Sequence, residues 1–412
     1  MAVPKPYKLE VSQDLLDWVN TRVQTARIIP DLDHPSGEEW NDGTPTAVME
    51  ELVNYWKTQY DWRRVEKNIN DTYKMFTIDL EENDELITLH FVHHRSERSD
   101  AIPLIFSHGW PGNFLEVENV LKLTNPEDPQ AQAFHVVAPS IPGFTLSSSP
   151  KKPDSLVVTH IASLYNKLMN ALGYKNYVAQ GGDWGSFITR SLALQFPESC
   201  SAIHINFIFC VPPSPLRNPI AIFWLLTRWF TADEKEKLKR MQWWMKSESG
   251  YSLIQGTKPQ TVSYGLLDSP IGMLAWIREK LQSLAEPNHV WQPELVITYT
   301  MLYLLSGSAG HARIYKSNIP TLRQTVMEPK FPSSVAVGVS CFPKDVGYVP
   351  KWWADCSFPN IVFWKEQEKG GHFASVEVPE GLLGDIQEWI GTVRSKGSSQ
   401  SWEALLKSGA TV

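Results

Sequence analysis

The 412-residue sequence is poor in cysteine, and its four cysteines are scattered without a C-x-x-C pair. They are Cys200, Cys210, Cys341 and Cys356. Disulfide scaffolds are small chains with many cysteines, and cysteine zinc sites need closely spaced thiols. The pattern therefore excludes a small disulfide scaffold and predicts reduced, mostly buried thiols.

Long hydrophobic runs and long basic runs are also missing. The most apolar short stretch, residues 220–226, is far shorter than the ~20 residues that span a bilayer. Neither end shows a signal segment or a retention address. The formal net charge is −7, and no basic patch indicates a nucleic acid or an anionic membrane as a partner. We expect a soluble, cytoplasmic protein without stable membrane insertion and without a nucleic-acid partner.

Apolar and aromatic residues are plentiful instead. The hydrophobic fraction is 42% and the charged fraction 20%, as in an ordinary globular protein. The chain exceeds the ~250–300 residues at which single cores stop growing, which favours one core with an added domain. The 17 tryptophans favour an apolar pocket for an uncharged ligand.

Short apolar runs alternate with helical segments from residue 102 onward. The runs that we interpret as strands are 102–106, 134–138, 177–180, 201–206, 335–342 and 360–364. Helical patterns follow at 158–172, 186–196 and 381–393. Such alternation indicates βαβ units and a mostly parallel sheet, and hence an α/β fold.

Two segments interrupt or precede this alternation. Residues 212–323 are helix-like and carry no clear strand signal, so they form an insertion over the carboxyl ends of the strands, where ligands bind. Before the sheet, Ser12 can cap one helix and Pro45 can be the first residue of another. Strand-like alternation follows at 75–80 and 86–92.

We therefore expect four parts. They are an N-terminal extension (1–95), an α/β core (96–211 and 324–396), a helical lid (212–323) and a C-terminal tail (397–412). The tail is rich in Ser and Gly and is expected to be partly mobile, although Trp402, Leu405 and Leu406 could dock.

Asp183 is the first candidate for chemistry. It stands in Gly181-Gly182-Asp183-Trp184-Gly185 at the end of an expected strand, which is the small-x-nucleophile-x-small pattern of a nucleophile elbow. A carboxylate can attack an sp³ carbon without prior deprotonation. The same residues also fit a Gly-rich turn with an Asp helix cap.

His372 and Asp345 follow in the order that α/β-hydrolases use. His372 lies in Gly370-Gly371-His372 after the last expected strand, and Asp345 follows the strand before it. The acid would orient the imidazole and stabilise its charged form. Asp355, Glu366 and Glu368 are rivals for the acid, and Asp345 is nearest to a strand end.

An oxyanion hole fits the segment His108-Gly109-Trp110-Pro111-Gly112. Its donors would be the backbone N–H groups of Trp110 and of Trp184, the residue after the nucleophile.

Two further patterns are weaker. Ser308 stands in a second small-x-nucleophile-x-small segment, but it follows a helical pattern and not a strand. His90 and His94 share one strand face, where a metal pair is conceivable and a solvated or interdomain face is the preferred interpretation. No metal or cofactor is expected.

These motifs together resemble the microsomal-type epoxide hydrolases, in particular the soluble fungal members. The likeness spans nearly the whole chain, including the N-terminal segment, which looks like the family's meander domain. Within the insertion, residues 249–259 and 313–316 look like the two lid tyrosine segments of the family. The resemblance implies an α/β-hydrolase fold, roles for Tyr251 and Tyr315, and a homodimer as one assembly to expect.

The mechanism that this resemblance implies has two steps. Asp183 attacks an epoxide carbon while Tyr251 and Tyr315 donate protons to the oxygen, because phenols with a pKa of ~10 are neutral donors at pH 7. His372, oriented by Asp345, then activates water to hydrolyse the ester, and the product is a vicinal diol.

Other activities fit the same triad. A haloalkane-type dehalogenase would use Asp183 and His372 without two lid phenols, and an epoxide-opening cyclase would replace water with a substrate hydroxyl. A ligand-binding protein without catalysis is a third alternative. The size of the epoxide, its regiochemistry and a role in detoxification or in secondary metabolism stay open.

Overall fold

The computed structural model describes residues 2–213, 216, 218–227, 230–396 and 399–410. A nine-stranded sheet lies at its centre, in the order β1-β2-β3-β5-β4-β6-β7-β8-β9. The antiparallel part comprises β1 (Lys5–Pro6), β2 (Met75–Glu82) and β3 (Glu85–His94), and β3 also pairs antiparallel with β5. The parallel part comprises β4 (Ile102–Ser107), β5 (Phe134–Pro139), β6 (Tyr177–Gly181), β7 (Cys200–Ile205), β8 (Ala336–Cys341) and β9 (Ile361–Glu366). The predicted strands and the mostly parallel α/β sheet are confirmed.

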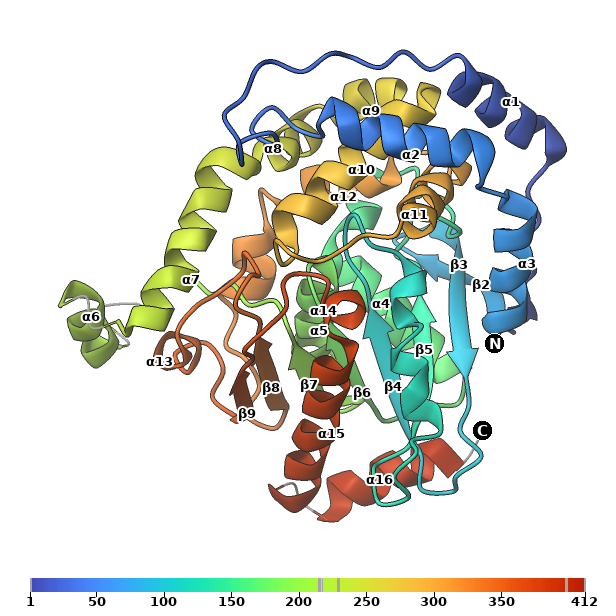
Figure 1. Cartoon of the computed structure of the whole chain (residues 1–412). Helices are drawn as coiled ribbons and strands as arrows, with labels where there is room; N and C mark the ends of the chain where they lie inside the picture. The colour runs from blue at the N-terminus through green and yellow to red at the C-terminus, as the bar shows by residue number, and fades with distance from the viewer. Residues whose placement is uncertain (1, 214–215, 217, 228–229, 397–398, 411–412) are drawn as a thin grey trace.

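Helices cover both faces of the sheet (Figure 1). Behind the sheet in that view pack α4 (Val158–Ala171) and α5 (Trp184–Gln195), and in front of it lies α15 (Pro379–Lys396). The connections on the core add the short helices η1 (Phe114–Val117), η2 (Val120–Thr124), η3 (Pro153–Leu156), α13 (Lys351–Ala354) and α14 (Ala374–Glu377). The central parallel strands are buried on both faces, which explains why their sequences are continuous apolar runs.

The regular elements in the described residues of the insertion between β7 and β8 are all helices, as predicted. Its helices are α6 (Pro219–Leu226), α7 (Ala232–Trp243), α8 (Gly250–Thr257), α9 (Pro259–Asp268), α10 (Pro270–Leu284), α11 (Pro293–Leu305) and α12 (Gly310–Asn318). π-Helical turns follow at Trp244–Glu248 and Arg323–Met327. Helices α8 to α12 lie over the carboxyl ends of the parallel strands (Figure 1).

The N-terminal helices wrap over this insertion. They are α1 (Gln13–Gln24), α2 (Thr46–Thr58) and α3 (Trp62–Thr72), and α1 packs on α10 while α2 packs on α11. Ser12 caps α1 by accepting a hydrogen bond from the Leu15 amide, as predicted. Pro45 is the capping residue before α2 and not its first helical residue, because its ψ of 149° is still extended.

The described part of the C-terminal tail forms the helix α16 (Ser399–Ala410). Leu405 is buried and the Ser408 hydroxyl accepts a hydrogen bond from the Asn176 amide at 3.0 Å, so the tail docks at the lower end of the sheet (Figure 1). The docking expected for Leu405 is therefore confirmed.

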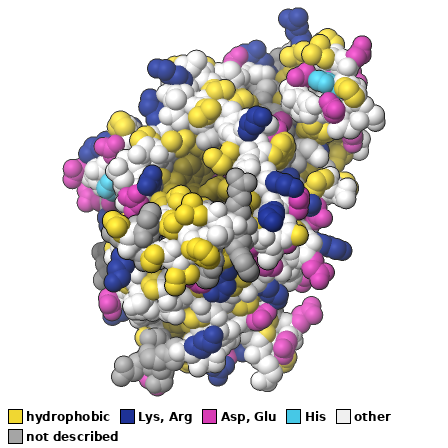
Figure 2. Space-filling model, turned by 90° about the vertical axis from the view of Figure 1, so that its left-hand side faces the viewer, with side chains coloured by type: hydrophobic (Ala, Val, Ile, Leu, Met, Phe, Trp, Pro, Cys, Tyr) yellow, Lys and Arg dark blue, Asp and Glu magenta, His cyan; other side chains and the backbone are white. Residues whose placement is uncertain are grey.

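Hydrophobic side chains gather around a hollow on the face that carries α6 (Figure 2). Ile220, Phe223 and Leu226 of this helix are exposed. No described helix combines the length and the apolar character that crossing a membrane requires.

All four cysteines are free thiols, and three of them are buried.

Candidate active site

Asp183 sits at a sharp turn between β6 and α5. Its φ of 50° and ψ of −129° are strained for a residue with a side chain. Glycine is needed next to it, since a side chain at Gly185 would collide with the Ser107 carbonyl group and one at Gly181 with that of Gly185. The turn lifts the Asp183 carboxylate above the sheet edge and places it at the N-terminus of α5, where negative charge is favoured.

Two groups hold the oxygens of this carboxylate. The Trp110 amide donates to Oδ1 at 2.8 Å, and Nε2 of His372 lies 3.2 Å from Oδ2. His372 in turn contacts Asp345, with 2.8 Å between Nδ1 and Oδ1. His372 and Asp345 are almost fully buried. The structure thus brings together three residues that are up to 189 positions apart, from 183 to 372.

The two carboxylates set the charge of the imidazole. Burial alone would lower the pKa of His372, but Asp345 and then Asp183 outweigh it and raise the pKa well above its usual value. The resting site therefore holds an imidazolium between two carboxylates. Nε2 has no aligned hydrogen-bond acceptor among the described residues, although Asp183 is close.

The two lid tyrosines lie together near Asp183. Tyr251 on α8 and Tyr315 on α12 have ring centroids 5.7 Å apart with nearly perpendicular planes. The Trp110 ring stacks on Tyr251 at 4.8 Å, and the Trp184 ring meets Tyr315 edge-on at 5.0 Å. Burial, with smaller effects from Asp183, raises both tyrosine pKa values, so both phenols are neutral.

The tryptophans also place backbone donors at the site. The Trp110 amide already points at Asp183, next to a cis peptide bond to Pro111. Trp184 is the first residue of α5, where N–H groups have no acceptor within the helix. The Trp110 ring is held by His311 of α12, whose Nδ1 accepts from Nε1 at 3.1 Å.

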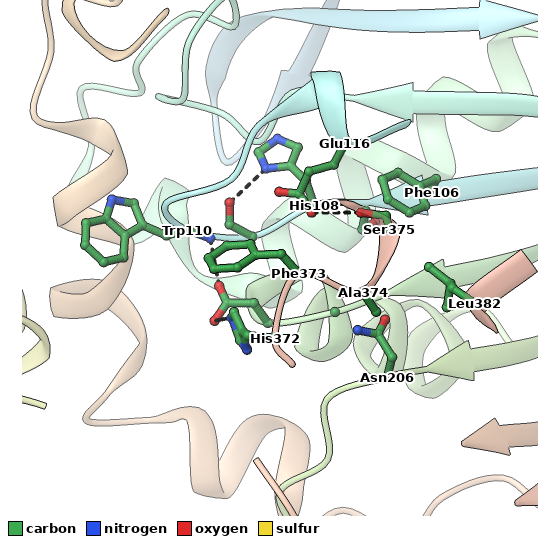
Figure 3. Close-up of a pocket in the computed structure, with 14 residues that line it drawn as sticks. Phe106, His108, Trp110, Glu116, Asn206, His372, Phe373, Ala374, Ser375 and Leu382 are labelled. Carbon is green, nitrogen blue, oxygen red and sulfur yellow. Dashed lines mark hydrogen bonds and ion pairs between the residues drawn. The ribbon is translucent and has the colours of Figure 1, made fainter. Parts of the chain in front are cut away.

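A narrow cavity opens beside Asp183 and His372. Figure 3 shows Glu116, Ser375, Phe106 and Leu382 around it, on the side of the strands, and the Trp110 ring on the opposite side. Neither lid tyrosine is among the described residues that line it.

The alternative residues lie elsewhere or have other partners. The Ser308 hydroxyl donates to the Gly143 carbonyl group at 3.4 Å and follows α11, not a strand. Asp355 pairs with Lys351, Glu366 pairs with Lys237, and Glu368 is exposed.

The two strand histidines do not form a solvated face. His90 is fully buried, with Nδ1 2.9 Å from the Ser140 hydroxyl, because β3 is covered by the loops after β4 and β5. Nε2 of His94 accepts from the Lys74 amide. Among the described residues, no three His, Cys, Asp or Glu side chains form a metal-like cluster.

Two charged residues near the site escaped the sequence analysis. Glu116 on η1 lines the cavity, and Lys280 on α10 holds its Nζ 4.7 Å from the centre of the Tyr251 ring. For Glu116 the available signal was a lone carboxyl in the otherwise apolar segment 114–117.

A parallel sheet with a nucleophile-type turn, a histidine after the last strand and a helical insertion defines an α/β-hydrolase. Comparison with known proteins agrees. The family described as "alpha/beta hydrolase fold" matches residues 102–232, and that described as "Epoxide hydrolase N terminus" matches residues 4–117.

Relatives cover nearly the whole chain. A putative epoxide hydrolase of Stigmatella aurantiaca is 34% identical over 95% of this chain and 86% of its own length. Epoxide hydrolase 1 of Sus scrofa is 30% identical over 95% and 89%. The structure of Aspergillus niger epoxide hydrolase matches with a TM-score of 0.81 at 31% identity, over 95% of this chain and 96% of that one. The chain belongs to the epoxide hydrolase family and is a hydrolase.

Proposed function

We propose that this chain opens an uncharged epoxide with water through a covalent ester on Asp183, giving a vicinal diol. The observation that carries the proposal is the Asp183 carboxylate on its strained turn, with the His372 imidazole 3.2 Å from one oxygen and two lid phenols nearby. A dehalogenase would need no such pair of phenols.

The first step forms the ester. An oxygen of Asp183 bonds to an epoxide carbon, the carbon–oxygen bond of the ring breaks, and the oxygen takes a proton from Tyr251 or Tyr315. The raised pKa values keep both phenols protonated until the substrate is in place. The two phenols can act as a pair, because the buried Tyr315 hydroxyl interacts with the Tyr251 hydroxyl.

Ester formation also prepares the base for the second step. The ester is neutral, so His372 loses one of the two carboxylates that raise its pKa. Its proton can then pass to the tyrosinate left by the first step, which frees Nε2 to accept a proton. Asp345 keeps the imidazole oriented through Nδ1.

The second step breaks the ester. Water oxygen adds to the Asp183 carbonyl carbon while Nε2 takes its proton. The oxyanion is held by the N–H groups of Trp110 and Trp184, a device worth about 2.7–4 kcal/mol per donor. Collapse expels the diol oxygen, which takes the proton from His372. The Asp183 carboxylic acid that remains then gives its proton to Nε2, which restores the carboxylate and the imidazolium.

The test is to trap the ester. His372→Gln should form the Asp183 ester at a normal rate and hydrolyse it about 100-fold or more slowly, so intact-protein mass rises by the mass of the epoxide. Asp183→Asn is the control and should show no added mass. A single turnover of the wild type in heavy-oxygen water should label the Asp183 carboxylate. Label in the diol alone would overturn the proposal.

The finer features are proposals as well. The apolar face around α6 supports an apolar epoxide as substrate. We also retain the division into 1–95, 96–211 with 324–396, 212–323 and 397–412, a cytoplasmic location and a homodimer. Limited proteolysis, cell fractionation and light scattering test these in turn.

A further inference from the structure

The cavity beside Asp183 lies on the far side of the carboxylate from the lid phenols. Ser107 at the end of β4 and Leu382 on α15 line it, and Figure 3 shows Leu382 and the Trp110 ring on opposite sides. Tyr251 stacks on this Trp110 ring, and Tyr315 meets the Trp184 ring edge-on. Only a small part of the space is wide enough for a water molecule. The cavity therefore suits water better than an epoxide with substituents.

Glu116 is placed inside this cavity by its local structure. Asn113 caps η1 by accepting from the Leu115 amide, and this turn directs the Glu116 side chain back towards Gly112. A side chain at Gly112 would collide with the Glu116 carboxyl group, so glycine is needed there. Protein surrounds Glu116, which keeps some accessible surface and lines the cavity.

Among the described residues, the Glu116 carboxyl group accepts one hydrogen bond from the backbone amide of Asn113 and one from a side chain. The side-chain partner is the Ser375 hydroxyl, 3.4 Å from Oε2, which is a weak hydrogen bond. Burial raises the pKa of Glu116 to about 8, so it is mostly neutral at pH 7. It therefore adds no third full negative charge beside Asp183 and Asp345.

A water that attacks the ester needs two acceptors in this space. One is Nε2 of His372, which takes the proton and has no aligned partner among the described residues. The other must fix the second O–H bond, so that a lone pair faces the Asp183 carbonyl carbon. Apart from Asp183, Glu116 is the only carboxyl group among the described residues that line the cavity.

We propose that Glu116 is a positioning residue for the hydrolytic water, held in the cavity behind Asp183, and that it acts on ester hydrolysis and not on ester formation. This rests on the two-step function proposed above. The carbonyl oxygen of the Glu116 carboxyl group accepts from the water, while His372 takes the proton that is transferred.

The experiment separates the two steps. Purified Glu116→Leu is mixed with styrene oxide, quenched in acid and weighed as intact protein. Ester formation should stay within about twofold of wild type, hydrolysis should fall about 10- to 100-fold, and the esterified fraction should rise accordingly. Glu116→Gln should recover most of the hydrolysis rate, because its amide oxygen can accept from the same water.

Matched variants exclude a general loss of structure. Glu118 is exposed and lies two residues further along the chain, so the variant Glu118→Gln should behave as wild type in both steps. If Glu116→Leu does not fold, Glu116→Ala carries the same expectation, because it removes the carboxyl group without added bulk. Equal loss in both steps, or no change in either, would overturn the proposal. If His372→Gln traps ester and the Glu116 variants do not, this inference alone fails; if neither traps it, the two-step function fails.

Discussion

The Asp183 carboxylate lies near two kinds of hydrogen-bond donor, and in the proposed mechanism they act at different times. The imidazolium of His372 and the Trp110 amide hold the resting carboxylate. The phenols of Tyr251 and Tyr315 have raised pKa values and stay neutral beside it. The negative charge that develops on the epoxide oxygen thus meets protons that are still bound, which is what acid assistance needs.

Removing both phenols should therefore stop the first step. In the His372→Gln background, Tyr251→Phe with Tyr315→Phe should reduce ester formation by about 100-fold or more, since a buried alkoxide would lack a donor. Each single variant should lose less, because the second phenol still reaches the oxygen. Acid-quenched mass spectra measure the ester, and a normal burst in the double variant would contradict the assignment.

Lys280 is expected to assist Tyr251. Its buried ammonium group lies 4.7 Å from the ring centre, beside Glu279, and a cation there stabilises negative charge as the phenol loses its proton. Lys280→Met should slow ester formation about 3- to 30-fold, because such contacts are worth on the order of 0.5–2 kcal/mol.

Ester hydrolysis supplies the internal control for this variant. It should be unchanged in Lys280→Met, and the exposed lid lysine Lys246, changed to Met, should affect neither step. Equal slowing of both steps would mean that Lys280 only supports the fold.

Residues at strand ends could be predicted from local patterns, whereas Tyr251 and Tyr315 on helices could be named only through the family resemblance. Asp183 and His372 follow core strands and are flanked by glycines that tight turns require, so their meeting above the sheet follows from the parallel topology. Lys280 and Glu116 neither follow a core strand directly nor have flanking glycines. Their positions depend on how α10 and η1 pack against the site, which periodicity alone does not determine.

The lid helix α12 is hydrogen-bonded to the core at its C-terminal end. Asn318 is fully buried, its Oδ1 accepts from the Val158 amide at 2.8 Å, and its Nδ2 donates to the Leu156 carbonyl group at 2.8 Å. Val158 begins α4, so a lid residue caps a core helix. Tyr315 lies one turn before Asn318 on the same helix.

Asn318→Ala should lower stability and slow the first step together. It leaves buried backbone groups at the start of α4 without partners, which costs about 1–3 kcal/mol for each unsatisfied group. The melting temperature should fall by several degrees, and ester formation should slow as Tyr315 loses its position. Asn170→Ala on the exposed side of α4 is the control. An unchanged melting temperature would show that the hydrogen bonds of Asn318 do not contribute to the folding stability.

Element boundaries show where tertiary contacts override local signals. The segment of α16 reads as a polar Ser- and Gly-containing tail, yet burial of Leu405 and the bond between Asn176 and Ser408 hold it as a helix. Helix α3 had a usable signal that was missed, since Asp61 caps it and Val65 and Ile69 bury one face. By contrast, the core strands were predictable because burial on both faces makes them uniformly apolar.

Across the whole molecule, the lid is held from two sides. The core holds it through Asn318, and the N-terminal helices hold it through Arg22 with Asp268 and Tyr60 with Thr298. Figure 1 shows α1 and α2 lying across α9 to α11. The N-terminal extension thus holds helices next to those that carry the phenols, because α9 packs on both α8 and α12. None of its described residues lines the cavity.

Buried titratable groups should give the molecule a stability maximum near pH 6.5. Burial lowers the pKa to about 3 or 4 for five neutral histidines, His90, His93, His108, His204 and His311. Their pKa in the unfolded chain is about 6.5, so the stability they contribute is present above that pH and is lost as pH falls towards 4.

Raised pKa values in the folded protein should limit its stability at alkaline pH. Burial raises the pKa of Glu116 to about 8 and that of Glu377 to about 7, and the carboxylates raise that of His372. Groups with a raised pKa contribute stability below their unfolded values and lose it as pH rises through the folded values. For the two glutamates the loss begins near pH 4.5, and for His372 it begins near 6.5.

The five histidines should determine how the folding stability changes below pH 6.5, because they outnumber the two glutamates with raised pKa values. The unfolded chain then binds about three more protons than the folded one, and the melting temperature should fall steeply between pH 6 and about 4.5. His93 lies 2.9 Å from the Tyr174 hydroxyl and lines no part of the cavity, so His93→Gln removes one of these protons without touching the site. Its melting temperature should depend less on pH in this window, as calorimetry would measure. If the melting temperature of the variant fell as steeply with decreasing pH, His93 would have to bind its proton equally well in the folded and unfolded states. Burial would then not lower its pKa.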